Sequence, residues 1–237
     1  MNIKVVGQQE FATTAADVIA DHILTGRTSQ ICFATGKTPV ETYKELVRRS
    51  QTGELNADKL KAFTLDEYVG LPLRHPRTCF YTLSTQLYDG LGLSPSQRFT
   101  FDMKTSPEDA ANQYEQTIRD EGGLDLCVLG IGTNGHVGFN EPGTPRDSRA
   151  HVAQLAEATM ERARLSGWLD VPSRGLTLGI ASLFDAKSVL LMANGRHKAD
   201  IVHRIVHGDI SENIPASWFR QHPNCLLLLD EEAASRL

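Results

Sequence analysis

The sequence predicts an α/β fold with a doubly wound, mostly parallel sheet of the Rossmann-like type. Short apolar runs alternate with longer amphipathic runs along the chain, and strands that alternate with helices are typical of this architecture. The run at 124–129, LDLCVL, is almost continuously apolar, as expected for a strand covered on both faces. No repeat, low-complexity tract or linker breaks the pattern, so we expect residues 1–237 to form one domain.

The short apolar runs are expected to be the strands, because each is about the length of an ordinary strand and is followed by turn residues. In chain order the expected strands cover residues 3–7, 30–34, 61–65, 99–103, 124–129, 176–180, 189–193 and 226–229.

The longer runs are expected to be helices, because their apolar residues recur on one face. The clearest signals surround the helix after residue 105, where Ser106 is expected at the N-cap, Pro107 at the first helical position and Gly122 at the stop. The other expected helices cover 11–24, 39–49, 80–87 and 198–206. Residues 143–172 are less regular, and we expect a loop with one helical piece that forms a lid over the site.

The composition fits a soluble globular protein, with 41% hydrophobic residues. A formal net charge of -5 and a pI of about 5.9 argue against nucleic-acid binding, which needs a basic footprint. The four cysteines are far apart, so we expect reduced, buried thiols and a cytoplasmic protein. The N-terminus shows no apolar signal segment, and no apolar run approaches the roughly 20 residues of a membrane span.

In a doubly wound sheet the ligand lies outside the carboxyl ends of the strands. The loops that follow expected strands at 34–38, 66–71, 130–143 and 194–198 are therefore the candidates for chemistry.

The first loop lies in FATGKTPVE, residues 33–41, where a strand passes through a glycine into a helix. Thr38 and Glu41 have capping-box spacing, and Pro39 suits the first helical position. A helix N-terminus favours a phosphate, and Lys37 adds a full charge. The alternative is an ordinary strand–helix turn with a solvated lysine. The loop lacks the GxxxxGK[ST] pattern of a Walker A sequence.

The second loop, in TLDEYVGL at 64–71, places Asp66 and Glu67 where a strand should end. A carboxylate there can act as a general base that faces the ligand. It can equally be a turn carboxylate that accepts nearby backbone N–H groups.

The third loop lies in LGIGTNGHVGFNEPG, residues 129–143, and has the glycine spacing of a dinucleotide-binding turn. Such a turn must lead straight into a helix, and HVGFNEPG is poor helix material. His136 and Glu141 instead suggest an acid–base pair. The alternative is a structural histidine in a tight loop.

The fourth loop lies in ANGRHKAD, residues 193–200, where Lys198 could reach a phosphate at the edge of the sheet or could be a solvated helix lysine. His203 and His207 share a helix face, but the Glu of HExxH and a third ligand are missing. We therefore expect no metal.

Taken together and in this order, these loops resemble those of the glucosamine-6-phosphate deaminase family. ATGKTP at 34–39 is similar to its ATGSTP phosphate loop. LDEYVGL at 65–71 and GHVGFNEPG at 135–143 resemble its two signature stretches, which form a specific combination. The resemblance runs from about residue 3 to DEEAA near the C-terminus.

This resemblance implies conversion of glucosamine 6-phosphate and water to fructose 6-phosphate and ammonia, a reaction of amino-sugar catabolism. It implies that Asp66 removes the C2 proton, and that His136 opens the sugar ring with Glu141 as its partner. It implies a small-molecule substrate, a monomer or small homo-oligomer, and neither a metal nor a redox cofactor. The phosphate-binding residues that it implies are Thr35, Gly36, Lys37, Thr38, Arg164 and Lys198.

Two residues depart from the family pattern. Asn134 stands where some members have aspartate, so we expect ring opening to depend more on Glu141. Lys37 replaces the serine of the phosphate loop and is expected to strengthen phosphate binding. The chain is also too short for the longer C-terminus of the allosteric hexameric members, so the resemblance is to the shorter, non-allosteric type.

Three other functions fit parts of the pattern. A deaminase for the galactosamine epimer would use the same catalytic residues. A 6-phosphogluconolactonase shares the fold and a similar glycine-rich loop, but it lacks FNEPG and needs no Asp66 base. A non-catalytic sugar-phosphate sensor is favoured by Asn134 and disfavoured by the presence of Asp66, His136 and Glu141.

Overall fold

The computed structural model describes residues 1–24, 28–165, 167–168 and 170–237. Its strands and helices match most of the predicted runs to within a residue or two. The strands are β1 (Asn2–Val6), β2 (Ser29–Phe33), β3 (Leu60–Thr64), β4 (Asp66–Tyr68), β5 (Arg98–Phe99), β6 (Leu126–Gly130), β7 (His151–Gln154), β8 (Arg174–Thr177), β9 (Ser188–Ala193) and β10 (Cys225–Asp230).

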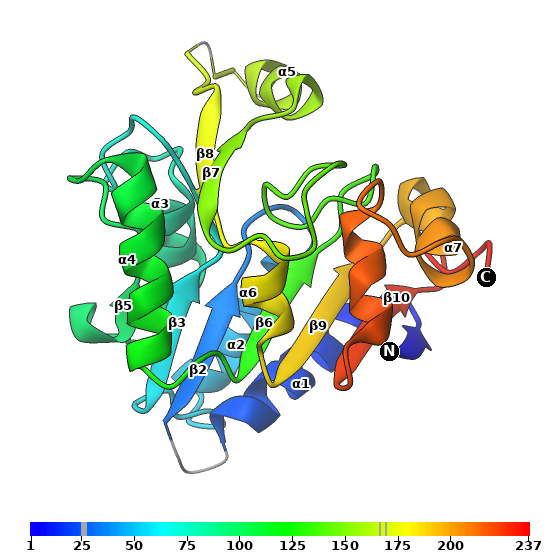
Figure 1. Cartoon of the computed structure of the whole chain (residues 1–237). Coiled ribbons are helices and arrows are strands. Elements are labelled where there is room, and N and C mark those ends of the chain that lie inside the picture. The colour runs from blue at the N-terminus through cyan, green and yellow to red at the C-terminus, as the bar shows by residue number, and fades with distance from the viewer. Residues whose placement is uncertain (25–27, 166, 169) are drawn as a thin grey trace.

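The helices cover both faces of the main sheet (Figure 1). The α-helices are α1 (Phe11–Ile23), α2 (Val40–Gln51), α3 (Cys79–Leu83), α4 (Pro107–Asp120), α5 (Glu157–Leu165), α6 (Ile180–Phe184) and α7 (Ala199–His207). The shorter turns of helix are η1 (Ser84–Tyr88), η2 (Pro95–Gln97), η3 (Arg196–Lys198) and η4 (Pro215–Gln221).

The predicted doubly wound parallel sheet is confirmed. Seven strands pair in the order β1-β10-β9-β6-β2-β3-β5, and every pair is parallel. The chain runs outward from β2 to β3 and β5 on one side, and from β6 to β9 and β10 on the other. The strand order therefore reverses between β2 and β6, which is where such sheets bind ligands. The four loops singled out in the sequence follow β3, β2, β6 and β9, four neighbouring strands.

The core consists of two apolar layers, one on each face of this sheet. Alternate residues of β6 lie in different layers, because successive side chains of a strand point to opposite faces. Leu126 and Val128 join the layer under α1 and α2, whereas Cys127 and Leu129 join the layer under α4, α6 and α7. All four cysteines are buried and unpaired, as predicted.

A second, smaller sheet was not predicted. Its three strands pair antiparallel in the order β4-β8-β7 and rise above the carboxyl edge of the main sheet, with α5 beyond them (Figure 1). The expectation for residues 143–172 was therefore incomplete, since β7 lies within that segment; residues 166 and 169 lie outside the described residues. The expected strand at 176–180 is β8, displaced toward the N-terminus and outside the main sheet.

Local predictions were confirmed at α4 and wrong at α2. The Ser106 hydroxyl accepts from the backbone N–H of Asp109, as an N-cap should. The capping box of Thr38 and Glu41 does not form: Pro39 is the N-cap of α2 and makes no side-chain cap bond, within a stretch that the structure describes fully. The Glu41 side chain is exposed and pairs with Lys44 instead.

Two further elements differ from expectation. The run at 80–87 is a short α-helix, α3, that continues into the π-helical turn η1. The strand expected at 99–103 shrinks to the two residues of β5 at the edge of the main sheet.

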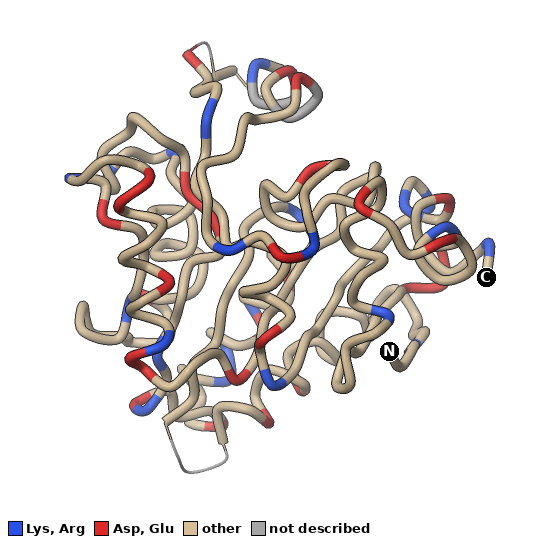
Figure 2. Tube along the Cα trace, in the orientation of Figure 1, with Lys and Arg blue, Asp and Glu red and all other residues tan. Residues whose placement is uncertain are grey.

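Charges of both signs are interspersed along the helices and loops (Figure 2). Among the described residues, no helix is both long enough and apolar enough to cross a membrane.

Candidate active site

The loop after β6 brings Asn134, His136 and Glu141 into one cluster. Glu141 Oε1 lies 3.3 Å from His136 Nδ1, and Glu141 Oε2 accepts a hydrogen bond of 2.7 Å from the Asn134 amide. Asn134 Oδ1 in turn accepts from the backbone N–H of His136 at 3.1 Å. A carboxylate beside one ring nitrogen can fix the imidazole tautomer and stabilise its charged form. Glu141 is thus placed to orient His136 and is itself held by Asn134.

The glycines of this loop make room for side chains rather than for a nucleotide. A Cβ atom on Gly132 would lie 2.3 Å from His136 Cε1, so only glycine lets the imidazole occupy this position. Gly135 has a φ of +88°, and a Cβ there would lie 2.6 Å from Ile214 Cγ2. No helix follows Gly135 in the fully described stretch 130–143, which agrees with the rejection of a dinucleotide turn.

Asp66 stands where the chain leaves the main sheet. β3 ends at Thr64, and Asp66 begins β4, opposite Thr177 of β8. The residue is 6% exposed, and within the described part of the chain its Oδ1 atom has no hydrogen-bond partner. Burial raises the pKa of Asp66 to about 6, against the opposing effects of the Cys79 thiol and the charge of His136. The result is a carboxylate more basic than an exposed one.

Glu67, the neighbouring acid, is a structural residue. Its Oε1 atom accepts from the backbone N–H groups of Tyr68 and Cys79, and its Oε2 atom accepts from that of Phe80. The carboxylate therefore ties β4 to the first residues of α3. Burial raises the pKa of Glu67 to about 7 despite these three bonds. Glu67 therefore fits the interpretation as a carboxylate that accepts backbone N–H groups. The interpretation as a general base remains for Asp66.

The loop between β2 and α2 contains Thr35, Gly36, Lys37 and Thr38. Lys37 is exposed, and Gly36 has a φ of +107°. Because α2 has no side-chain cap, the amides at its N-terminus are not taken by Thr38. An uncapped N-terminus beside an exposed lysine suits an anion better than the predicted capping box would.

Lys198 and Arg164 occupy different surroundings. Lys198 is buried at the end of η3, and its Nζ donates to the backbone carbonyl of Ile131 at the start of the His136 loop. Arg164 lies in α5, beyond the main sheet, and its half-exposed guanidinium pairs with Glu157 at 2.6 Å. The structure therefore joins Lys198 to the site, whereas the role of Arg164 stays a prediction.

A cavity of about 470 Å³ lies beside Glu141, bounded by residues 142–145 and by β7. Most of the residues that line this cavity lie within the segment 143–172, whose role as a lid stays a prediction. No group of three or more His, Cys, Asp or Glu side chains in the described residues is arranged to hold a metal ion. His203 Nδ1 contacts the backbone carbonyl of Arg236, and the His203 ring packs against that of His207.

Cys79 and Thr177 belong to this region although no sequence pattern marks them. Cys79 sits at the start of α3, where its backbone N–H donates to Glu67 and its Sγ lies 3.6 Å from Thr35 Oγ1. The Thr177 hydroxyl accepts from the backbone N–H of Phe139 and so supports the loop that contains Glu141. For Cys79, one sequence signal was available. Thr78 directly precedes it, and the Thr78 hydroxyl caps α3 and so marks where that helix begins.

Comparison with known proteins covers nearly the whole chain. The family model described as glucosamine-6-phosphate isomerases/6-phosphogluconolactonase matches residues 6–227. The glucosamine-6-phosphate deaminase of Rhodopirellula baltica is 40% identical over 242 residues, covering 100% of this chain and 96% of the relative. That of Bacillus pumilus is 38% identical, with 96% of each chain covered.

Solved structures agree with the sequence relatives. A monomeric glucosamine-6-phosphate deaminase matches with a TM-score of 0.94 and 35% identity, over 100% of both chains. A 6-phosphogluconolactonase from Trypanosoma cruzi matches with a TM-score of 0.82 and 19% identity, over 100% of this chain and 96% of its own, a likeness of fold alone. This chain belongs to the family of glucosamine-6-phosphate isomerases and 6-phosphogluconolactonases.

Proposed function

We propose that this protein converts glucosamine 6-phosphate and water into fructose 6-phosphate and ammonia. One observation carries the proposal beyond family membership. Asp66 is a buried carboxylate of raised pKa, within electrostatic reach of the His136–Glu141 pair, at the edge of the sheet where ligands bind. An aldose–ketose isomerisation needs both a base for the C2 proton and a separate group for ring opening.

Ring opening is assigned to His136. The imidazole gives a proton to the ring oxygen and takes one from the anomeric hydroxyl. The carboxylate of Glu141, 3.3 Å from Nδ1, stabilises the charged imidazole while it holds the extra proton. Asn134 contributes by holding Glu141, through the 2.7 Å bond from its amide.

Isomerisation is assigned to Asp66. The opened aldehyde acidifies the C2 proton, and the Asp66 carboxylate removes it to leave an enolamine. The proton then returns to C1, which gives the C2 imine; water adds to this imine, and ammonia leaves. Burial supports this role because it disfavours the charged form of the carboxylate and so makes it a stronger base.

The phosphate is assigned to the loop Thr35–Thr38 and the N-terminal amides of α2. Lys37 adds a positive charge at the exposed side of that loop, and Lys198 adds one from the opposite side of the reversal point. Arg164 would bind the phosphate only if the segment of β7 and α5 closed over the site as a lid.

The test is to incubate the purified protein with glucosamine 6-phosphate, galactosamine 6-phosphate and 6-phosphogluconolactone, and to measure ammonia, ketose and acid separately. We expect ammonia and fructose 6-phosphate in equal amounts from the first substrate. Turnover of the galactosamine epimer alone would reassign the substrate, and acid from the lactone alone would indicate a lactonase. Binding of an amino sugar without turnover would favour a sensor and contradict the proposal.

We further propose that the protein acts as a monomer in the cytoplasm. The relative of known structure with a TM-score of 0.94 is a monomeric enzyme, and Asn134, His136 and Glu141 contact one another within one chain. Sedimentation equilibrium across a range of concentrations should give the mass of one chain, and a mass that rises with concentration would contradict this.

A further inference from the structure

We propose that Asp230 is a positioning residue for Lys198: its carboxylate fixes the turn between β9 and η3, and so sets where the Lys198 ammonium meets the phosphate of the substrate. This inference rests on the proposed function, which assigns Lys198 to that phosphate. Asp230 is the first residue of the DEEAA stretch at 230–234, for which the sequence indicated no role.

Asp230 lies at the carboxyl end of β10, beside the end of β9. The two strands are parallel neighbours, and Ala193, the last residue of β9, is opposite Leu229. The backbone N–H of Gly195 donates to both oxygens of the Asp230 carboxylate, at 3.0 Å to Oδ1 and 2.9 Å to Oδ2. Asp230 is 1% exposed, so water does not compete for this contact.

The carboxylate is held in turn by the chain that follows β10. Its Oδ1 atom also accepts from the backbone N–H of Ala233 at 2.7 Å, and the backbone carbonyl of Asp230 accepts from that of Ala234 at 3.0 Å. Ala233 is itself fully buried. Asp230 therefore links two turns, the one after β10 and the one after β9, and a shift of its side chain would break bonds in both.

The turn after β9 leads directly to Lys198. Gly195 has a φ of +84°, which favours glycine, and its carbonyl accepts from the backbone N–H of Lys198 at 3.0 Å. Lys198 is buried, and its Nζ donates to the backbone carbonyl of Ile131, in the loop that contains His136. Because Gly195 lies one helical turn before Lys198, the bond to Asp230 fixes the backbone from which the charged side chain starts.

This anchoring should act on phosphate affinity. A lysine is a point charge on a flexible stem, and ordering that stem around a ligand costs conformational entropy. A backbone already fixed by Asp230 reduces this cost before the phosphate arrives, which is the general effect of preorganisation. Loss of the Asp230 carboxylate should therefore weaken phosphate binding by way of Lys198.

The test is a double-mutant cycle of Asp230→Ala and Lys198→Ala, measured as the affinity for inorganic phosphate in a phosphorus NMR titration. Asp125→Ala is the matched control. Asp125 is also buried and accepts from a backbone N–H, that of Gln30 at 2.9 Å, but it precedes β6 at the opposite edge of the main sheet. The KM and kcat for ammonia release are measured on the same variants.

We expect Lys198→Ala to weaken phosphate binding about 10–100-fold, as expected for a lost hydrogen bond between charged groups. Asp230→Ala should weaken it about 3–10-fold. The double variant should bind no more weakly than Lys198→Ala, because Asp230 acts through that lysine. In Asp230→Ala the KM should rise with the dissociation constant while kcat changes less, and Asp125→Ala should match the parent protein.

Phosphate affinity in Asp230→Ala equal to that of the parent, or losses that add in the double variant, would overturn the role of Asp230. Should Asp230→Ala not fold, Asp230→Asn decides. The Gly195 N–H meets both carboxylate oxygens, so the amide nitrogen would face it in either orientation, and binding should again weaken. A folded Asp230→Asn with the affinity of the parent would contradict the proposal.

The phosphate titration needs no turnover. Failure of the parent protein to release ammonia therefore counts against the proposed function, whereas the affinities of the four proteins of the cycle decide the role of Asp230. A parent protein that binds phosphate no better than Lys198→Ala would also overturn that role.

Discussion

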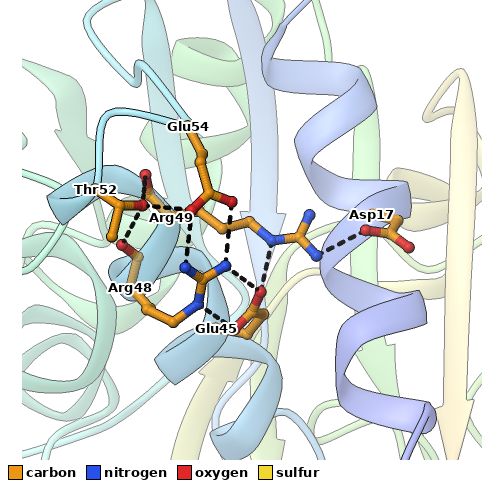
Figure 3. Close-up of polar contacts among 6 residues, drawn as sticks. All are labelled: Asp17, Glu45, Arg48, Arg49, Thr52 and Glu54. Atoms are coloured by element: carbon orange, nitrogen blue, oxygen red, sulfur yellow. Dashed lines mark hydrogen bonds and ion pairs between the residues drawn. The ribbon is translucent and has the colours of Figure 1, made fainter.

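Two groups of carboxylates in this molecule have pKa values that are shifted in opposite directions. One lies on the surface between α1 and α2, where Glu45 and Glu54 accept hydrogen bonds from arginines (Figure 3). Hydrogen bonds from Arg48 and its neighbours lower the pKa of both glutamates to about 2. The other group lies at the edge of the sheet, where burial raises the pKa of Asp66 to about 6 and that of Glu67 to about 7.

The difference shows which carboxylates can move protons. Arg48 and Arg49 hold their partners ionised across the physiological range, and Arg49 also joins α2 to Asp17 of α1. Such a network ties two helices together but has no proton to exchange near pH 7. Burial instead raises the pKa of Asp66 to about 6, so its proton is exchangeable near neutral pH. Local surroundings, not residue type, separate acids that stay ionised from acids that can exchange a proton near pH 7. Among the latter, the three backbone hydrogen bonds of Glu67 give that acid a structural role.

The largest effect is expected when the buried base is removed. Asp66→Asn should lower kcat by about 10²–10⁴-fold, the range that general-base catalysis supplies. Substrate binding should change little, since the phosphate loop is untouched. Turnover assays and equilibrium binding of glucosamine 6-phosphate check this, and parent-like turnover would remove Asp66 from the mechanism.

The same variant should be more stable than the parent at neutral pH. The raised pKa means that the folded state binds the Asp66 proton more tightly than the unfolded state, so ionisation of Asp66 costs stability as the pH rises from about 4 to about 6. Thermal unfolding should show a higher Tm for Asp66→Asn above pH 6 and no gain below about pH 4. A lower Tm throughout would contradict this effect of burial.

Removing the partner of the imidazole should have the next largest effect. Glu141→Gln keeps the shape but loses the charge that stabilises protonated His136, so kcat/KM should fall by about 10²-fold. Proton exchange at C2 should remain measurable with an open-chain substrate analogue, since Asp66 is intact. Equal loss of both activities would mean that Glu141 serves isomerisation as well as ring opening.

A smaller effect is expected from adding a charge to the site. Asn134→Asp would replace the 2.7 Å hydrogen bond to Glu141 by two neighbouring carboxylates, one of which must take up a proton more readily. The pH profile of kcat should change modestly, because an ionisable carboxylate replaces a neutral amide beside Glu141. Complete loss of activity would show that the amide is essential as a donor.

The smallest effect is expected on the surface. Glu45→Gln removes the contacts to Arg48 and Arg49 but should destabilise the fold by at most about 1 kcal/mol at pH 7, with kcat unchanged. Because the pKa of Glu45 is lowered to about 2 in the folded protein, its contribution to stability is fully present above about pH 4.5. That contribution is lost as the pH falls toward 2. Unfolding at pH 7 and pH 3 checks the sign, and a changed kcat would break the contrast between the two groups.

The parallel sheet and its loops could be predicted because they depend on local pattern. Buried parallel strands such as β6 and β9 are apolar runs, and turn residues follow them. The smaller sheet could not, since β7 is half-exposed and gains its partner only through β8. The contacts of Cys79 with Glu67 and Thr35 likewise depend on how α3 packs, which no local spacing records. Thr38 shows the converse, a correct local pattern that the fold does not use.

The most direct measurement is the pH dependence of C2 proton exchange with solvent deuterium, catalysed by the parent protein on glucosamine 6-phosphate. Since burial raises the pKa of Asp66 to about 6, exchange should fall as the pH drops through about 6, and Asp66→Asn should abolish it. An acid limb near pH 4, the value of an exposed aspartate, or exchange that survives in Asp66→Asn, would contradict the assignment of this buried carboxylate as the base.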